Sequence, residues 1–143
     1  MLRLSGDLIG EDNLIRTNEI MWGIMGVVNF AYLRSRKGDT GAAQELLRKG
    51  RDALNQMQAH PYTDGKIPYI LAQISAIEGN NENAMNYFRK AIDAGWIRPW
   101  FARIDPIMAD LRKDDAYLQI LEELEGRLVE MRERSQILAS NTP

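Results

Sequence analysis

The residue types that most often perform chemistry are sparse in this chain. It has no cysteine and a single histidine, His60, which precedes Pro61 in a polar stretch. A lone histidine lacks the second ligand or the orienting partner that metal binding and acid-base catalysis need. A chain without cysteine has no disulfide, thiolate metal site or cysteine nucleophile. We therefore predict that the protein is not an enzyme and uses no metal or other cofactor.

The acidic side chains do not suggest a catalytic pair either. Asp114 and Asp115 come directly before a long periodic stretch, where an acidic side chain typically caps a helix. Glu122, Glu123 and Glu125 fit a solvated helix face. The sequence also lacks a glycine-rich phosphate loop and a nucleophile elbow. The residues thus favour binding over catalysis.

Three aromatic residues close together, Trp96, Trp100 and Phe101, are the sharpest candidates for contacting a partner. Dense aromatic side chains can anchor a bound protein. They can equally cover the core that an open stack of helices exposes at its end. We expect them to cover the end of the core, and partner anchoring is the alternative.

The elements that would position these residues are helices. Over residues 66–95, apolar residues recur at three- and four-residue steps on both sides of Gly79, which is the spacing of one helical face. Glycine allows the left-handed turn that ends a helix, and Asn80 or Asn81 can cap the next one. The stretch predicts an antiparallel helix pair.

A similar pattern occurs earlier in the chain. Thr17 or Asn18 can cap a first helix, and a glycine turn and a second periodic stretch follow it. We therefore predict another helix pair over residues 17–58. Residues 1–13 show no sustained period and could form a short helix or a docked arm, or be the trimmed end of a longer protein. Residues 1–16 are assigned to an N-terminal arm.

The first of these helices has a wide apolar face. Trp22, Met25 and Phe30 broaden its inner stripe, so we expect contacts on more than one side. Gly23 and Gly26 each cost helix stability, by about 1 kcal/mol relative to alanine. Their presence predicts that another helix approaches closely.

Two classes of partner are disfavoured. The most apolar run, residues 20–33, is shorter than the roughly 20 residues that cross a bilayer, so we interpret it as a buried helix and predict no membrane insertion. The formal net charge is −2. A chain without an excess of basic residues has no general positively charged surface for nucleic acid.

The last part of the chain predicts closing helices over residues 105–138. Asp105-Pro106 is a typical helix start, because aspartate caps and proline suits the first helical position. Asp114 or Asp115 then caps a long helix with an apolar stripe at four- and three-residue steps. The stripe consists of Tyr117, Leu121, Leu124, Leu128, Met131 and Leu138.

The pair over residues 66–95 resembles the tetratricopeptide repeat, a helix-turn-helix unit of about 34 residues. The matching positions are Leu71-Ala72, Gly79-Asn80, Ala84, Phe88 and Ala91. Pro68, Ser75 and Trp96 replace the usual Trp, Tyr and Pro of the family. The resemblance implies an all-α fold, in which antiparallel helix pairs stack as a short α-solenoid with a long C-terminal capping helix. Residues 1–143 would form a single domain.

The closing segment is similar to the end of tetratricopeptide arrays attached to bacterial winged-helix regulators and nucleotide cyclases. The residues concerned are Asp105-Pro106, Leu111-Arg112, Asp114, Tyr117 and Leu121. This resemblance implies the interaction or sensing module of a larger bacterial regulatory protein, whose effector domain would precede Met1. The compartment would be the cytoplasm, or the periplasm if the module is the exported part of a membrane-anchored regulator.

The family also implies a groove lined by the first helix of each pair. The positions carried over include Met25, Val28 and Ile77, and some of the set also belong to the predicted core stripes, so the division between groove and core stays open. The polar or amphipathic groove positions are Tyr32, Arg36, Lys66, Tyr69 and Gln73. Such side chains suit an extended peptide with some acidic character, so the expected function is a non-enzymatic protein-interaction scaffold. The alternative is self-association as a homodimer, because the stripe on the last helix is longer than capping requires.

Overall fold

The computed structural model describes residues 2–57 and 65–141, with side chains from residue 19 onward. These residues form six α-helices and two short 3-10 helices and contain no strand, which confirms the predicted all-α class. The helices are α1 (Leu2–Arg36), α2 (Thr40–Met57), α3 (Lys66–Ile77), α4 (Asn81–Asp93), α5 (Pro99–Ile104), η1 (Pro106–Met108), η2 (Leu111–Lys113) and α6 (Asp115–Ser140). His60 lies outside the described residues.

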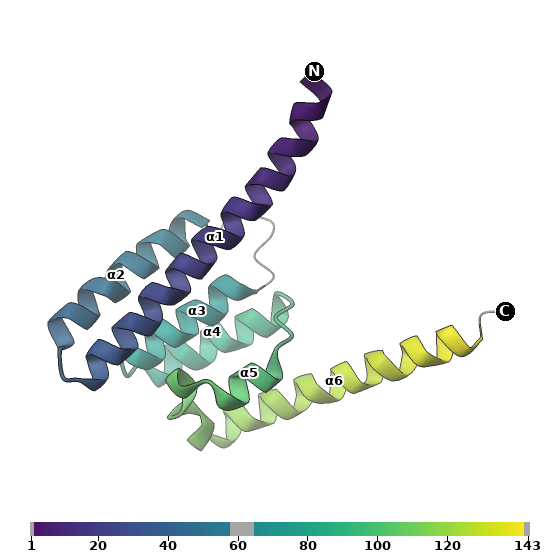
Figure 1. The fold of residues 1–143 in the computed structure, drawn as a ribbon. Coiled ribbons are helices and arrows are strands. Elements are labelled where there is room, and N and C mark those ends of the chain that lie inside the picture. The colour runs from purple at the N-terminus through teal and green to yellow at the C-terminus, as the bar shows by residue number, and fades with distance from the viewer. Residues whose placement is uncertain (1, 58–64, 142–143) are drawn as a thin grey trace.

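The helices pack as two antiparallel pairs followed by a closing segment (Figure 1). The first pair is α1 with α2, and α3 of the second pair lies against both of these helices. The closing segment, α5 to α6, covers the other side of the second pair. The first half of α1 and the second half of α6 extend away from this body (Figure 1).

Local chemistry sets the helix ends as the sequence predicts. Gly38 and Gly79 adopt left-handed backbone angles, with φ of 83° and 79°, at the two turns within the pairs. The Asn80 side chain accepts a hydrogen bond from the Asn83 amide at 3.1 Å. The Asp114 side chain accepts a hydrogen bond from the Ala116 amide at 2.9 Å. The predicted caps are therefore confirmed.

The predicted start of the first helix is wrong. α1 begins at Leu2, has 35 residues and passes through residues 2–16 and the expected cap at Thr17 or Asn18 without a break. Serine, aspartate and asparagine each cost an α-helix less than about 1 kcal/mol, and no proline interrupts the stretch. The lack of a period there therefore did not mean the lack of a helix.

The interpretation of residues 20–33 as a buried helix is also wrong in part. One face of α1 is buried against α2 and α3 through Ile24, Val28 and their neighbours. The opposite face leaves Trp22, Phe30 and Leu33 exposed. α1 therefore packs on one side within this chain, although its apolar residues occupy two.

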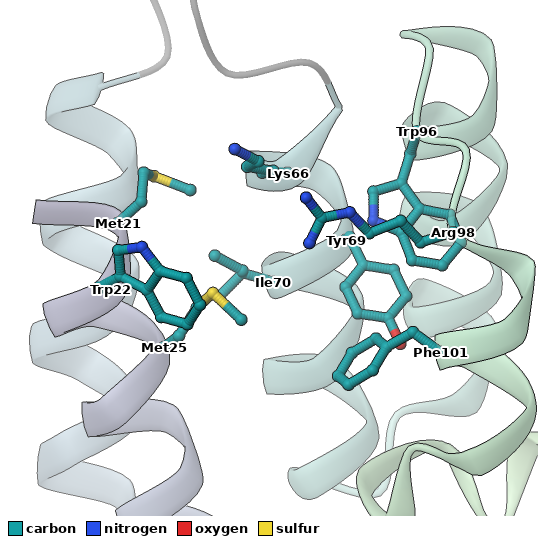
Figure 2. Close-up of a pocket in the computed structure, with 9 residues that line it drawn as sticks. All are labelled: Met21, Trp22, Met25, Lys66, Tyr69, Ile70, Trp96, Arg98 and Phe101. Atoms are coloured by element: carbon teal, nitrogen blue, oxygen red, sulfur yellow. The ribbon is translucent and has the colours of Figure 1, made fainter. Parts of the chain in front are cut away.

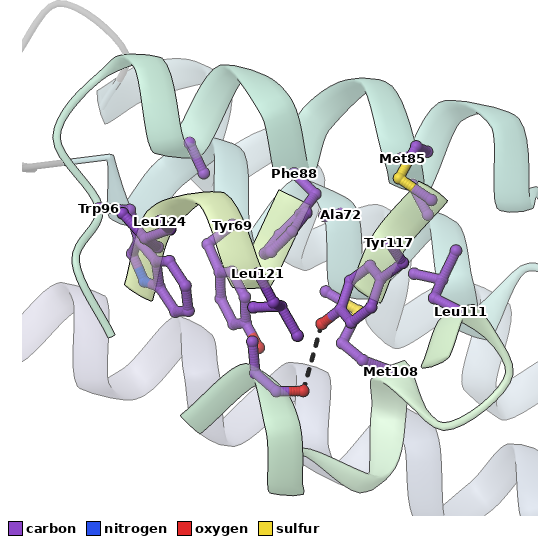
Figure 3. Packing of buried hydrophobic residues seen from close by; sticks show 13 residues of the cluster. Tyr69, Ala72, Met85, Phe88, Trp96, Met108, Leu111, Tyr117, Leu121 and Leu124 are labelled. Carbon is purple, nitrogen blue, oxygen red and sulfur yellow. Dashed lines mark hydrogen bonds between the residues drawn. The ribbon is translucent and has the colours of Figure 1, made fainter. Parts of the chain in front are cut away.

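The core consists of two clusters that share α3. The first joins α1, α2 and α3 and takes in Ile107 from η1. The second joins α3 and α4 to the closing segment (Figure 3). In the second cluster the rings of Phe88 and Tyr117 stack at 4.6 Å. The Tyr117 hydroxyl donates a hydrogen bond to the Ala102 carbonyl oxygen at 3.2 Å, which fixes α5 against α6 (Figure 3).

The apolar stripe of α6 divides into two parts. Tyr117, Leu121 and Leu124 are buried in the second cluster, so they are core residues and do not face another molecule. Leu128 is half-buried, and Met131 and Leu138 are exposed beyond the body. The sequence pattern could not separate the two parts, because the spacing continues unchanged across them.

Candidate binding groove

A pocket lies between α1, the start of α3 and the segment that leads into α5 (Figure 2). Its cavity volume is about 70 Å³, and the empty space rises to about 540 Å³ when the open solvent at its mouth is included. Its lining residues are Met21, Trp22, Met25, Lys66, Tyr69, Ile70, Trp96, Arg98 and Phe101. We call it the cationic pocket, because Lys66 and Arg98 are the only charged residues in its described lining.

The two walls of the cationic pocket differ in stiffness. On one side, α1 contributes the flexible thioether chains of Met21 and Met25, which adapt to irregular shapes. On the other side, the Trp96 ring stacks on Tyr69 at 4.3 Å with 8° between the ring planes. The Phe101 ring packs against the Tyr69 ring at an angle of 55°, with 5.8 Å between the ring centroids. An apolar side chain entering the pocket would meet one adaptable wall and one rigid aromatic wall.

The electrostatics of the pocket favour an anionic group. Lys66 and Arg98 lie at the rim, and no acidic residue is among the described residues that line the pocket (Figure 2). Among the described residues, neither cation takes part in an ion pair. Their positive charge is therefore available to a ligand, where it would attract and orient a carboxylate.

A buried carboxylate holds the rigid wall in place. Asp105 is only 2% exposed. One of its oxygens, Oδ2, accepts hydrogen bonds from the Tyr69 hydroxyl at 2.7 Å and from Gln73 Nε2 at 2.8 Å. Its other oxygen accepts from the Ile107 amide at 3.0 Å, which confirms Asp105 as the predicted cap. We refer to Asp105, Tyr69 and Gln73 as the Asp105 cluster.

The hydroxyls around the Asp105 cluster act as hydrogen-bond donors. Burial raises the pKa of the Tyr69 hydroxyl far above its ordinary value, and the negative charge of Asp105 raises it further. Burial likewise raises the pKa of Tyr117, again with a contribution from Asp105. Both hydroxyls stay protonated and serve as hydrogen-bond donors.

The predicted groove residues do not form one continuous surface. Lys66 and Tyr69 line the cationic pocket. Tyr32 and Arg36 lie at a second pocket, where α1 and the end of α3 meet η1. Arg36 donates a hydrogen bond to the Tyr32 hydroxyl at 3.3 Å there. Ile107 of the closing segment also lines this second pocket.

Gln73 corrects the prediction of an accessible groove residue. It is buried, and its amide is bonded to Asp105. The closing segment occupies the place where a peptide could have contacted this side chain. The carry-over from the family could not anticipate this, because the occupant comes from a part of the chain outside the two helix pairs.

The sequence predicted the aromatic cluster only in part. Trp96 is buried on Tyr69 and covers the core as expected, whereas Trp100 is exposed. Phe101 and Arg98 both line the cationic pocket. Arg98 was not predicted as a binding residue, and Phe101 was one only under the alternative in which the aromatic residues anchor a partner. The closeness of Arg98 and Phe101 to Trp96 in the sequence could have indicated that they share a site. The position of this segment on α3 depends on the hydrogen bonds of Asp105 to Tyr69 and Gln73, which the sequence does not reveal.

Other kinds of site find little support. Within the described ranges, no group of three or more metal-ligating side chains could hold an ion. No helix in the same part of the chain is long and apolar enough to cross a membrane. The chain matches no protein-family model, no curated protein and no solved structure at a significant level. The interpretation of the groove therefore rests on its own geometry.

Proposed function

We propose that the protein is a non-enzymatic, tetratricopeptide-like scaffold that binds a peptide segment of another protein. The observation that carries the proposal is the cationic pocket, which combines an apolar interior with two cations at its rim. Ligand pockets are usually apolar concavities in which a few polar groups set orientation. A segment with an apolar anchor beside an acidic group matches that combination.

The proposed binding mode uses the two walls separately. A leucine or aromatic side chain of the peptide enters between Met25 and the Tyr69–Trp96 stack. A carboxylate beside it in the peptide lies between Lys66 and Arg98. The apolar anchor supplies most of the affinity, and the charges select the partner and its orientation.

We further propose that this scaffold is the interaction or sensing part of a bacterial regulatory protein, in the cytoplasm or in the periplasm of a membrane-anchored form. Support comes from the repeated Gly-(Asp/Asn) turns at Gly38 and Gly79 and from the Asp105-Pro106 closing segment. Both features resemble tetratricopeptide arrays that serve effector domains. A regulator of this kind requires binding and no catalysis from this part of the chain.

Replacing Lys66 and Arg98 together with glutamate is expected to weaken peptide binding by about 10- to 100-fold, because like charges would then meet the acidic group. Peptides would be selected from a random display library on the wild-type protein, synthesised and titrated by fluorescence. We expect the selected peptides to pair an acidic residue with a leucine or an aromatic residue.

The matched control for this experiment replaces Lys49 and Arg89 with glutamate. Both cations are exposed on α2 and α4, outside the cationic pocket, and the change in net charge is the same. Equal binding by the two double variants would refute the pocket as the site. Selected peptides without acidic residues would refute the proposed chemistry.

A second candidate function is self-association through the distal half of α6. Met131 is 60% exposed there and continues the stripe of Leu128 beyond the body (Figure 1). Four- and three-residue spacing is typical of helices that pair in a coiled coil. A second copy of the chain is the simplest partner for such a stripe.

This alternative predicts that Met131→Lys lowers the mass of the particle in solution, because a charge would enter the seam between two helices. Val129→Lys places the same charge on another face of α6, where Val129 is also exposed, and should leave the mass unchanged. Light scattering after size exclusion measures both. Wild-type mass in the Met131 variant would contradict the alternative.

A further inference from the structure

The outer face of α1 is an apolar surface that no described part of the chain covers. Trp22 lies at its edge and also borders the cationic pocket. Trp22 is 70% exposed, Phe30 53% and Leu33 54%. Together with Gly26 these residues follow at steps of four, four and three, which places them along one side of the helix. Isolated exposed apolar residues are ordinary, but large ones gathered on one face mark an interaction site.

Two glycines on this face also lack an explanation within one chain. A Cβ atom added at Gly23 or at Gly26 would meet nothing within 4 Å. Glycine destabilises an exposed helix relative to alanine. No neighbouring element in the described structure packs closely against the backbone at either glycine. The close helix approach that the sequence predicts at these positions is therefore not made by any described part of this chain.

We propose that the occupant of this face is a second copy of the chain, with the two α1 helices packed antiparallel and crossing near Gly26. Trp22 lies one turn before Gly26 and Phe30 one turn after it. An antiparallel crossing at Gly26 therefore places Trp22 of each copy beside Phe30 of the other. The absence of a side chain at the crossing point lets the backbones approach closely.

The charges along α1 favour the same arrangement. Glu19 lies toward one end of the face, and Arg34 and Lys37 lie toward the other, all of them exposed. Antiparallel packing brings the acidic end of each copy to the basic end of the other, whereas parallel packing would place like charges together. Arg34 forms an ion pair with Asp39, with 3.5 Å between the nitrogen and the oxygen, and its side chain stays exposed. The Arg34 guanidinium also lies over the Phe30 ring, 5.6 Å from the ring centroid.

The exposed area suits a reversible dimer. A fully buried aromatic side chain covers about 150–250 Å², so the exposed parts of Trp22, Phe30 and Leu33 supply roughly half of the ~800 Å² per copy in a standard interface. The remainder would come from the glycine backbone and the polar side chains around them. We therefore expect dimerisation in the range of about 1 μM, which is a typical affinity for a modest interface.

The experiment measures the mass of the full chain by light scattering over a concentration series, with Gly26→Leu as the test variant. Position 26 is open in the single copy, so the variant should fold like the wild type, which circular dichroism checks. The control is Gly126→Leu, because Gly126 is an exposed helical glycine in α6 with nothing within 4 Å of its Cβ position. We expect a 16.3 kDa particle for Gly26→Leu and twice that mass for the wild type and the control.

Three results would overturn the proposal. A wild-type chain that remains at 16.3 kDa well above micromolar concentration has no such interface. A Gly26→Leu variant that still dimerises uses another surface. Loss of the dimer in Met131→Lys with its retention in Gly26→Leu would assign the contact to α6. None of these results depends on peptide binding at Lys66 and Arg98, so the two proposals fail separately.

Cross-linking tests the antiparallel arrangement directly, because the chain contains no cysteine of its own. Gly26→Cys should form a disulfide between two copies under mild oxidation, since equivalent positions meet only near the crossing point and a disulfide needs Cα atoms within about 7 Å. Arg34→Cys should not cross-link to itself. Equal cross-linking at both positions would indicate parallel helices and would refute the arrangement.

Discussion

Replacing Asp105 with alanine is expected to lower the free energy of unfolding by about 3–5 kcal/mol, the range for removing one partner of a buried charged group. The carboxylate accepts hydrogen bonds from Tyr69, Gln73 and the Ile107 amide. Alanine would leave these donors buried without an acceptor, and each unsatisfied group costs about 1–3 kcal/mol. Urea unfolding followed by circular dichroism measures the change.

Asp114→Ala is the matched control, because it removes an aspartate that caps a helix at an exposed position. Loss of an exposed cap costs about 1 kcal/mol. Tyr69→Phe should fall between the two, since it removes one donor and keeps the ring stacked on Trp96. If Asp105→Ala costs no more than Asp114→Ala, the Asp105 cluster does not hold the closing segment.

Gly65→Ala should destabilise the protein by about 3–5 kcal/mol, through strain and overpacking that each cost about 1–3 kcal/mol. Gly65 has a φ of 76°, and an added Cβ would lie 2.5 Å from the Ala91 carbonyl oxygen and 2.9 Å from the Trp96 amide. Both obstacles are backbone atoms. To relieve these clashes, the end of α4 and the segment around Trp96 would have to move together.

The control for this prediction is Gly79→Ala. Gly79 has nearly the same angle, with φ of 79°, but nothing lies within 4 Å of its Cβ position. The left-handed conformation alone costs a non-glycine residue about 1–2 kcal/mol. Chemical denaturation of both variants separates strain from collision. Equal losses at the two positions would show that the approach of Gly65 to Trp96 contributes nothing to stability.

The sequence predicted most of the features that depend on neighbouring residues. The turns at Gly38 and Gly79 and the caps at Asn80 and Asp114 follow from local backbone chemistry. The all-α class follows from the spacing of apolar residues. These interactions span a few residues each, so a single sequence contains the information for them.

Features that depend on distant partners could not be predicted. Asp105 was correctly interpreted as a cap, and that interpretation accounts for only one of its two oxygens. The partners of the other oxygen, Tyr69 and Gln73, lie 36 and 32 residues earlier in the chain. Because a local reading had already explained Asp105, nothing indicated that the closing segment would cover Gln73 and reduce the expected groove to two pockets.

The unpartnered face of α1 escaped prediction for a related reason. Periodicity shows which residues share a helix face, but it cannot show which face another element will cover. Trp22 and Phe30 were therefore assigned to contacts within the chain. The structure places them on the side that α2 and α3 leave open.

The distance of Asp105 from its partners also affects how the protein is made. A ribosome adds about 5–20 residues per second, so the 36 residues between Tyr69 and Asp105 take roughly 2–7 s to synthesise. During that interval α3 exists without the acceptor for its tyrosine and glutamine, and water must hydrate both groups. The nascent first pair and α3 can collapse early, whereas the side of α3 that faces the closing segment reaches its final packing only after translation has passed residue 105.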